Sequence, residues 1–486
     1  MLQLLPPPVP KAHSTVLPTG KAVLGQYMTP APIAAFMSSL FPKTITAFHL
    51  LDAGAGEGNL TRAFLKARCH TDRSFPHGEV SLFEYDADMT RKLERNIIQM
   101  VAGMPVTPHI HHTDFIEYAS TLVLRKQRPF THAILNPPYK KISSHSAHKA
   151  LLREAGIETV NLYTAFVALS LALLRPRGIL VAIIPRSFCN GPYYRPFRQY
   201  ILRHSAIRRL HLFTSRTEAF KADKVLQENV ILVLERDAEQ NALDISMSKN
   251  GEMDEYREER YPFEKIVRPD DPELFIHIPD CQGEQISLCG ADHSLESLGI
   301  EVSTGPVVDF RLKEHLRTMP LPDDAPLLYP GHFNGKTEWP RANFKKPNAM
   351  ARCPETMKWL YPNGHYVIVR RLSSKEEKRR VVAYHVQPKD FPGHPYLGFE
   401  NHLNVFHRRK QGLPPELACG LALYLNSSFV DILFRSFNGH TQVNATDLRS
   451  LPYPSTDTLE ALGRWADRQA ELTQENVERH IKAVLA

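Results

Sequence analysis

The sequence contains no hydrophobic run long enough to cross a membrane. No segment of the 486 residues approaches the ~18 consecutive apolar residues that a membrane-spanning helix needs. The apolar first residues are interrupted by three prolines, Pro6 to Pro8, before a signal-peptide core of about 7 to 15 residues can form. We therefore expect a soluble, cytoplasmic protein with no membrane partner.

Cysteine is scarce, and its spacing fits neither a disulfide framework nor a zinc site. The six cysteines include no C-x-x-C pair and have no partner histidine at zinc spacing. They are Cys69, Cys189, Cys281, Cys289, Cys353 and Cys419. We expect reduced thiols and no bound metal ion.

Length and charge indicate a multidomain protein with an uneven charge distribution. The chain is about three times the ~150 residues typical of one domain, so two or three cores are expected. Residues 1–240 hold 29 basic and 18 acidic residues, a net charge of +11, whereas residues 241–486 have a net charge of −4. A polyanionic partner such as nucleic acid is compatible with this charge, although ordinary cytosolic enzymes often carry a similar total.

Strand-like and helix-like segments alternate from about residue 45 to residue 236. Strands are predicted at residues 45–54, 79–86, 130–139, 178–185, 207–213 and 229–236. Helices are predicted at residues 59–70, 89–103, 161–174 and 194–204. Several strands are apolar on both faces, which indicates an α/β fold with a mainly parallel sheet between helices.

The alternation stops at a polar, acidic stretch, residues 236–265, which we interpret as a boundary or surface excursion. Short strands follow at 365–372 and 379–388, and the chain ends in helical segments. Asp457 and Glu460 have the spacing of a capping box at the start of the last segment. We predict a first domain at 1–240 and a second, α+β domain with C-terminal helices at 241–486.

A glycine-rich motif, Leu51-Asp-Ala-Gly-Ala-Gly-Glu-Gly58, follows the first strand. Glycines at a strand-to-helix turn let the backbone approach a ligand closely at the carboxyl edge of a parallel sheet. Asp52 and Glu57 would repel a pyrophosphate, so a dinucleotide is disfavoured and a cationic, nucleotide-like ligand fits better. The alternative is a tight turn without a ligand.

Two further motifs follow later strands. Glu84 ends the second strand, where a carboxylate can accept hydrogen bonds from a ribose diol, although such an acid is as often a helix cap. Asn136-Pro-Pro-Tyr139 follows the strand at 130–135. The successive prolines hold the chain extended and present the Asn136 amide and backbone carbonyls rigidly. This motif is typical of a receptor for a planar group bearing an NH₂, and the alternative is a proline turn with a packed tyrosine.

Taken together, these motifs carry a family resemblance. The Asp52–Gly58 loop followed by Asn-Pro-Pro-Tyr resembles the amino-methyltransferases that use S-adenosylmethionine. Residues 25–37 are similar to the motif that precedes this loop in the gamma class, TaqI-like adenine-specific DNA methyltransferases of restriction-modification systems. The resemblance covers roughly residues 20–240, and weaker similarity to type II modification enzymes lies in residues 303–311, 398–407 and 437–452. It implies a Rossmann-like catalytic domain followed by a target-recognition domain.

The resemblance also implies a role for individual residues. The cofactor S-adenosylmethionine would be bound by Tyr27, Thr29 and Pro30 at its methionine part, by Asp52, Gly54, Gly56 and Glu57 along the loop, by Glu84 at the ribose and by Asp114 at the adenine amino group. The target amine would be bound by Asn136 and Pro137 within the turn that Pro138 completes, with Tyr139 and Phe220 stacking on the extruded base.

The expected reaction is direct methyl transfer to the N6 amino group of a flipped adenine in double-stranded DNA. The same motif also occurs in enzymes that methylate protein glutamine or RNA guanine, and these are the alternative. A non-catalytic DNA-binding protein is a third possibility, disfavoured because Asp52, Asn136 and Tyr139 are all present.

Partners follow from the same resemblance. Only 24 residues precede Gly25 and no nuclease motif stands out, so we expect modification without cleavage and a separately encoded restriction endonuclease. A monomer in a bacterial or archaeal cytoplasm is the simplest expectation. Basic clusters at residues 341–346, 370–380 and 407–410 could contact phosphates or form solvated faces. The sequence leaves open the recognised DNA site and the roles of His111 and His112.

Overall fold

The structure is a computed structural model that describes residues 28–43, 47–68, 76–214, 228–279, 290–334, 336–374 and 376–485. Two of the residues predicted to bind cofactor or base, Tyr27 and Phe220, lie outside the described residues.

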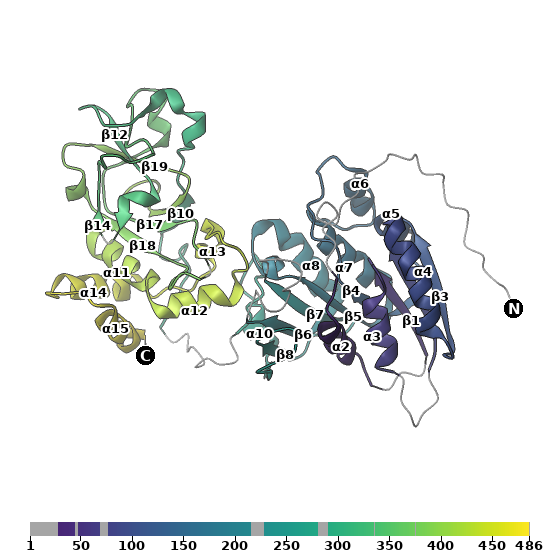
Figure 1. Ribbon diagram of the computed structural model, residues 1–486. Coiled ribbons are helices and arrows are strands. Elements are labelled where there is room, and N and C mark those ends of the chain that lie inside the picture. The colour runs from purple at the N-terminus through teal and green to yellow at the C-terminus, as the bar shows by residue number, and fades with distance from the viewer. Residues whose placement is uncertain are drawn as a thin grey trace. The chain divides into compact units, whose positions relative to one another are not determined.

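A nine-stranded sheet forms the first part of the molecule (Figure 1). Its strands are β1 Ala47–Ala53, β2 His77–Glu84, β3 Val106–His112, β4 Phe130–Leu135, β5 Leu174–Pro185, β6 Ser205–Phe213, β7 Asn229–Arg236, β8 Leu243–Ser248 and β9 Arg257–Tyr261. They lie in the order β3-β2-β1-β4-β5-β7-β6-β8-β9. β1 pairs in parallel with β2 and β4, as do β2 with β3 and β4 with β5. The α/β fold with a mainly parallel sheet is thus confirmed.

Helices connect these strands. They are α2 Ala31–Ser39, α3 Asn59–Lys66, α4 Ala87–Val101, α5 Phe115–Leu124, α6 Ala147–Glu154, α7 Leu162–Ala172, α8 Arg195–His204 and α10 Phe263–Ile266. α3 and α4 contact β2, β3 and β4, and α7 contacts β1 and β4. Every residue of α7 from Tyr163 to Leu171 is buried, which explains its nearly uniform apolar sequence.

The chain divides into two compact units. The first contains the described residues of Met1–Ile184 and Ile231–Asp237, and the second those of Pro185–Arg216, Leu226–Val230 and Ala238–Ala486. The polar stretch after residue 236 forms the last two strands of the sheet, β8 and the edge strand β9, instead of a linker. These compact units do not test the predicted division near residue 240 between a catalytic domain and a target-recognition domain, which stays a prediction.

The distal part of the second unit contains smaller sheets and the C-terminal helices. Its strands are β10 Glu301–Thr304, β11 Leu316–Arg317, β12 Ala325–Leu328, β13 Phe333–Asn334, β14 Lys336–Thr337, β15 Ala349–Met350, β16 Leu360–Pro362, β17 Tyr366–Arg370, β18 Ala383–Val386, β19 Tyr396–Phe399 and β20 Leu403–His407. Its helices are α11 Pro415–Leu425, α12 Ser428–Phe437, α13 Ala445–Arg449, α14 Thr456–Asp467 and α15 Gln474–Leu485. The sheet orders are β10-β20-β17-β18 and β11-β15-β12-β19-β16.

Close helix packing holds the C-terminal part together. α11 and α14 approach so closely that a Cβ on Gly420 would lie 1.8 Å from the carbonyl oxygen of Leu459, which excludes any larger residue. The N-cap of α14 is Ser455, whose side chain accepts from the Thr458 N–H, so the predicted cap at Asp457 is wrong by two positions and Asp457 lies in the first turn.

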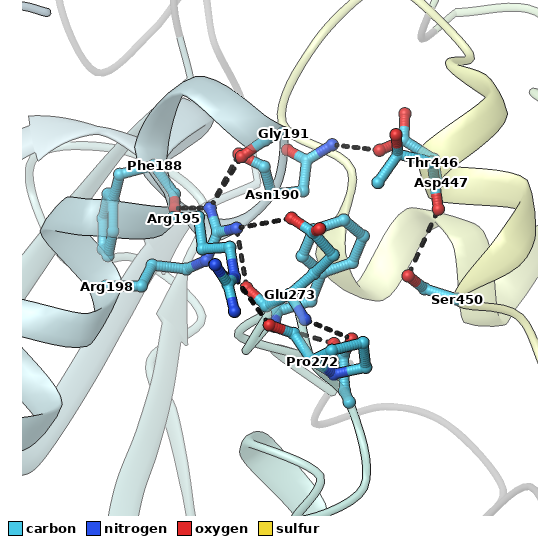
Figure 2. A network of polar contacts seen from close by, with 12 residues as sticks. Phe188, Asn190, Gly191, Arg195, Arg198, Pro272, Glu273, Thr446, Asp447 and Ser450 are labelled. Atoms are coloured by element: carbon cyan, nitrogen blue, oxygen red, sulfur yellow. Dashed lines mark hydrogen bonds and ion pairs between the residues drawn. The ribbon is translucent and has the colours of Figure 1, made fainter.

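Residues 186–198 are fastened to the rest of the second unit by buried polar groups (Figure 2). The guanidinium of Arg198, which is fully buried, donates to the carbonyls of Phe188, Asn190 and Glu273 at 2.8 to 3.0 Å. The Asn190 amide donates to Asp447 at 3.2 Å. The chain leaving β5 is therefore integrated into a body built mainly from later residues.

Within the described residues, no single helix is both long and apolar enough to span a membrane. α11 and α12, which meet at a 60° bend, pass that test only as a pair and only by length and composition.

Candidate active site

The glycine-rich loop turns sharply between β1 and α3. Gly54, Gly56 and Gly58 have φ values of +84°, +55° and +86°, a region that side-chain-bearing residues rarely adopt. The N–H groups of Gly54 and Ala55 both donate to the Phe83 carbonyl at 2.9 Å. The loop thus bends over the end of β2 and has no side chains along Gly54 and Gly56, which leaves its backbone accessible to a ligand.

Asp52 is a buried acid beneath this loop. One of its oxygens, Oδ2, accepts from the Thr61 hydroxyl at 2.7 Å, whereas Oδ1 is buried without a hydrogen-bond partner among the described residues. Burial raises the pKa of Asp52 to about 7, and the nearby Glu84 adds to the effect. A cation bound nearby would favour the ionised carboxylate, so this acid suits a positively charged ligand.

Glu84 and Glu57, the other predicted acids of this region, differ in environment. Glu84 is 4% exposed and accepts from the Gly56 N–H at 2.9 Å and from the Asp86 N–H at 2.8 Å. Burial raises its pKa. Glu57, by contrast, forms an ion pair with Lys92 of α4 at 3.0 Å. Glu84 therefore braces the loop, and Asp52 rather than Glu57 is the acid held beneath it.

Asp114 follows β3 and caps α5. Its Oδ1 accepts from the N–H groups of Ile116 and Glu117, and its Oδ2 accepts from His148 Nε2 at 2.9 Å. Burial alone would raise the pKa of Asp114, but the hydrogen bond and charge of His148 bring it below its ordinary value, and Asp114 in turn raises the pKa of His148. His148 could not be predicted from the sequence, because this bond spans 34 residues.

The Asn-Pro-Pro-Tyr turn follows β4, beside the loop. The Asn136 amide donates to the Thr29 hydroxyl at 3.0 Å, and its Oδ1 accepts from the Tyr139 hydroxyl at 3.1 Å. The Tyr139 hydroxyl also lies 3.3 Å from the Ile183 carbonyl. This network connects the predicted cofactor residue Thr29 to the predicted catalytic amide.

His111 and His112, whose roles the sequence left open, pack at the end of β3. His111 stacks on Phe83 with ring centroids 4.4 Å apart, and burial lowers its pKa. His112 donates to the Tyr85 carbonyl at 3.1 Å. Tyr85 is 50% exposed directly after Glu84, a position that the sequence analysis did not single out.

The parallel sheet brings most of the predicted site residues to one edge. Asp52, Glu84, Asp114 and Asn136 each end or closely follow one of the parallel strands β1, β2, β3 and β4, so they lie at the carboxyl edge of the sheet. Pro137 is buried and Pro138 is half-buried within the turn, and Pro30 precedes α2. The described residues contain no group of three or more His, Cys, Asp or Glu placed to hold a metal ion.

Several basic side chains in the clusters of the second unit form ion pairs or hydrogen bonds within the protein. Lys346 pairs with Asp309 at 2.7 Å, and Arg379 pairs with Glu478 at 3.1 Å. Arg380 is 1% exposed and donates to Ser373, Asn438 and the His440 carbonyl. These side chains therefore contribute to the fold, and their number in the sequence overstates the positive charge available to a ligand.

The strands lie in the order β3-β2-β1-β4-β5-β7-β6, the glycine-rich loop follows β1 and Asn-Pro-Pro-Tyr follows β4. Together, this strand order and these two motifs define a Rossmann-like methyltransferase of the class that depends on S-adenosylmethionine. A family model described as Eco57I restriction-modification methylase matches residues 82–220. Comparison with known proteins narrows the class further.

Two relatives match almost the whole chain. Type II methyltransferase M.BsuBI of Bacillus subtilis is 50% identical over 479 residues, which cover 95% of this chain and 94% of the relative. Type II methyltransferase M.PstI of Providencia stuartii is 39% identical over 472 residues, which cover 94% and 92%. The chain therefore belongs to the adenine-specific type II DNA methyltransferases of restriction-modification systems, and the predicted gamma-class resemblance is confirmed.

A solved structure shares the fold. The cryoEM structure of the DrdV–DNA complex superposes with a TM-score of 0.51 at 13% identity, over 91% of this chain and 57% of that chain. The family membership favours DNA over the RNA and protein substrates of related amino-methyltransferases.

Proposed function

We propose that this enzyme transfers a methyl group from S-adenosylmethionine to the exocyclic N6 amino group of an adenine that is flipped out of duplex DNA. The observation that carries the proposal is the position of the Asn136 amide, hydrogen-bonded between Thr29 and Tyr139 at the sheet edge beside the glycine-rich loop. The catalytic set proposed is Asn136, Pro137, Pro138 and Tyr139.

The Asn136 side chain and the Pro137 carbonyl would accept hydrogen bonds from the adenine amino group. That nitrogen is a poor nucleophile because its lone pair is delocalised into the ring. Two rigid acceptors polarise its N–H bonds and orient the lone pair for in-line displacement. The Tyr139 hydroxyl donates to Asn136 Oδ1, and an amide oxygen carries two lone pairs.

The cofactor supplies a methyl group on a positively charged sulfur, and the described residues fit such a cation. Asp52 presents a buried carboxylate with one unpartnered oxygen beneath the loop, and Gly54 and Gly56 leave room for close approach. Thr29 and Pro30 lie beside the catalytic turn, Glu84 would accept from the ribose hydroxyls, and Asp114 would accept from the cofactor's adenine amino group. Tyr27 and Glu57 complete the proposed set, with Glu57 the more peripheral because it pairs with Lys92.

Tyr139, and Phe220 outside the described residues, would stack on the extruded base. Stacking of this kind offsets the cost of unpairing by roughly 1 to 3 kcal/mol per base. We assign catalysis to residues 1–240 and target recognition to residues 241–486. We further propose a monomer that acts in the cytoplasm on chromosomal DNA, with any cognate endonuclease encoded separately.

The direct test is transfer of labelled methyl from S-adenosylmethionine to unmethylated plasmid DNA, followed by nucleoside analysis. We expect N6-methyladenine with the wild type and a loss of roughly 100-fold or more in kcat for Asn136→Ala, since one preorganised hydrogen bond in a catalytic site is worth that much. Label recovered in RNA or protein instead of DNA would contradict the proposal.

The matched control is Asn241→Ala, because Asn241 lies exposed in the loop before β8 and far from Asn136 in sequence. Its activity should equal that of the wild type. Calorimetric binding of S-adenosylmethionine to Asn136→Ala shows whether the cofactor site survives the substitution. An active Asn136→Ala enzyme would remove this residue from the mechanism.

A further inference from the structure

The loop after β20 is a two-residue hairpin turn of unusual composition. The N–H of Arg408 donates to the Gln411 carbonyl at 3.0 Å, and the N–H of Gln411 donates back at 2.7 Å. The two residues between them, Arg409 and Lys410, have φ values of +48° and +63°. Positive φ at both central positions is the geometry of a type I′ turn, which favours Asn-Gly.

This backbone conformation is disfavoured for arginine and lysine. Non-glycine residues with positive φ are uncommon because Cβ crowds the backbone. In the part of the chain that the structure describes, no other two neighbouring non-glycine residues share it. Strain of this kind persists only where the surroundings hold it, and it is concentrated at functional sites.

The surroundings of the 408–411 turn do hold it. The Arg409 N–H donates to a carboxylate oxygen of Glu301 at 3.2 Å, and the Lys410 N–H donates to His407 Nδ1 at 3.1 Å. The hydroxyl of the buried Tyr366 lies 3.2 Å from the Lys410 carbonyl. The turn is thus fixed through its backbone while its two central side chains remain exposed.

The exposed side chains form a compact cationic surface. Lys410 Nζ donates to the Lys358 carbonyl at 3.1 Å and lies near the Tyr361 ring, and Lys358 lies over Trp359 at 4.3 Å. The Arg409 guanidinium has no hydrogen-bond or ion-pair partner among the described residues, unlike most of the basic side chains discussed above. Glu301 is the acid that faces the turn, and its carboxylate accepts from a backbone N–H.

We propose that the 408–411 turn contacts the phosphodiester backbone of the DNA substrate through Arg409 and Lys410. The inference rests on the proposed function for its choice of DNA. Phosphate contacts position a protein on the duplex without reading sequence, and they require cations that internal pairs have not neutralised. Arg409 and Lys410 meet that requirement. The strained backbone conformation of the turn holds both side chains at the surface.

The test separates charge from strain with three variants. The variant Arg409→Gln with Lys410→Gln removes the charges and keeps the strain, Arg409→Asn with Lys410→Gly removes both, and Arg409→Lys with Lys410→Arg keeps both. Binding of a short fluorescein-labelled duplex is measured by anisotropy at several salt concentrations. The sequence of the duplex is taken from a plasmid, and methylation of that plasmid by the wild-type enzyme is measured separately.

We expect both uncharged variants to bind roughly tenfold more weakly, and the slope of log affinity against log salt to fall by about two. The Asn-Gly variant should also unfold at a higher temperature than the wild type, so stability and DNA affinity change in opposite directions. The charge-preserving variant should bind as the wild type does.

The matched control is Lys126→Asn. Lys126 also has positive φ (+56°) but precedes β4, at the amino edge of the sheet. This variant should gain stability without losing DNA affinity. If the wild type methylates the plasmid and the Gln-Gln variant keeps wild-type affinity and salt slope, the inference about the turn is wrong. If the wild type methylates no DNA, the proposed function itself is contradicted.

Discussion

Both units bury charges of both signs, but the loops described above are organised by acids in the first unit and by arginines in the second. In the first unit, Asp52, Glu84 and Asp114 lie at strand ends and accept hydrogen bonds from loop N–H groups or neighbouring side chains. In the second unit, Arg198 and Arg380 are buried and donate to loop carbonyls. Each unit uses a charged side chain to organise backbone that has no strand or helix partner.

The difference indicates which charged side chains of each unit are available to a ligand. Acids beneath a loop create a site for a cation, which suits the methyl donor of this family. The buried arginines of the second unit donate to loop carbonyls, so the proposed contacts to DNA phosphates would come from exposed cations such as those of the 408–411 turn. Net charge, which is negative for residues 241–486, therefore says little about that surface.

The largest expected effect concerns Asp52. Because its folded-state pKa of about 7 lies above its ordinary value of 3.8, its contribution to the stability of the fold is complete below pH 3.8 and is lost as pH rises through 7. Without cofactor, wild type should lose up to about 4 kcal/mol relative to Asp52→Asn over that range. Urea unfolding of both proteins between pH 4 and pH 9 measures the difference, and parallel stability curves would show that Asp52 is not perturbed.

The same titration predicts the pH dependence of cofactor binding. In the proposed site the ionised carboxylate would attract the cationic cofactor, so the Kd for S-adenosylmethionine should rise as pH falls below 7 in the wild type. In Asp52→Asn the Kd should be higher and independent of pH. Titration calorimetry at several pH values tests this, and a pH-dependent Asn variant would assign the effect to another group.

A nearly equal effect is expected in the second unit, from Arg380. Arg380→Met should lower the free energy of unfolding by about 3 kcal/mol, because Asn438 Oδ1 and the His440 carbonyl lose a buried donor. The neighbouring exposed Lys378→Met is the control and should change it by less than about 0.5 kcal/mol. Equal unfolding curves for the two variants would mean that Arg380 is not structurally important.

A smaller effect is expected at Thr29, where the proposed cofactor motif meets the proposed catalytic turn. Thr29→Val removes the acceptor of the Asn136 amide and should lower kcat about tenfold, whereas Thr29→Ser retains it. Initial rates of methyl transfer at saturating cofactor separate kcat from KM. Full activity in the valine variant would show that Asn136 holds its orientation without Thr29.

The smallest effect should come from Glu57. Its ion pair with Lys92 is partly exposed and worth about 0 to 1 kcal/mol, so Glu57→Gln should barely change stability or cofactor affinity. A large rise in the Kd for S-adenosylmethionine would instead place Glu57, and not Asp52, beside the cation.

Local motifs could be predicted from the sequence because their chemistry lies within a few residues. The Asp52–Gly58 loop and the Asn136–Tyr139 turn each follow a strand directly, and parallel strands bring such ends to one edge. β3 was missed because Pro108 and three histidines interrupt its apolar pattern, and its side chains are mostly half-buried.

Contacts between distant segments could not be predicted in this way. The sequence gives no signal that His148 donates to Asp114, or that Arg380 is buried while Arg409 is exposed. The polar composition of 236–265 hid two strands, β8 and the edge strand β9, because an edge strand can be exposed and charged.

Several hydrogen bonds of residues 186–190 can form only after residues about 250 positions later have been synthesised. Arg186 donates to the carbonyls of Arg435 and Ser436, 249 and 250 residues later, and Asn190 donates to Asp447, 257 residues later. At ~5 to 20 residues per second, a ribosome needs about 12 to 50 s to cover that interval. A chain stalled before residue 435 has every residue of its first unit and the Glu228 partner of Arg186, but it lacks the carbonyls of Arg435 and Ser436. The full set of bonds to the segment after β5 can therefore form only when translation is nearly complete.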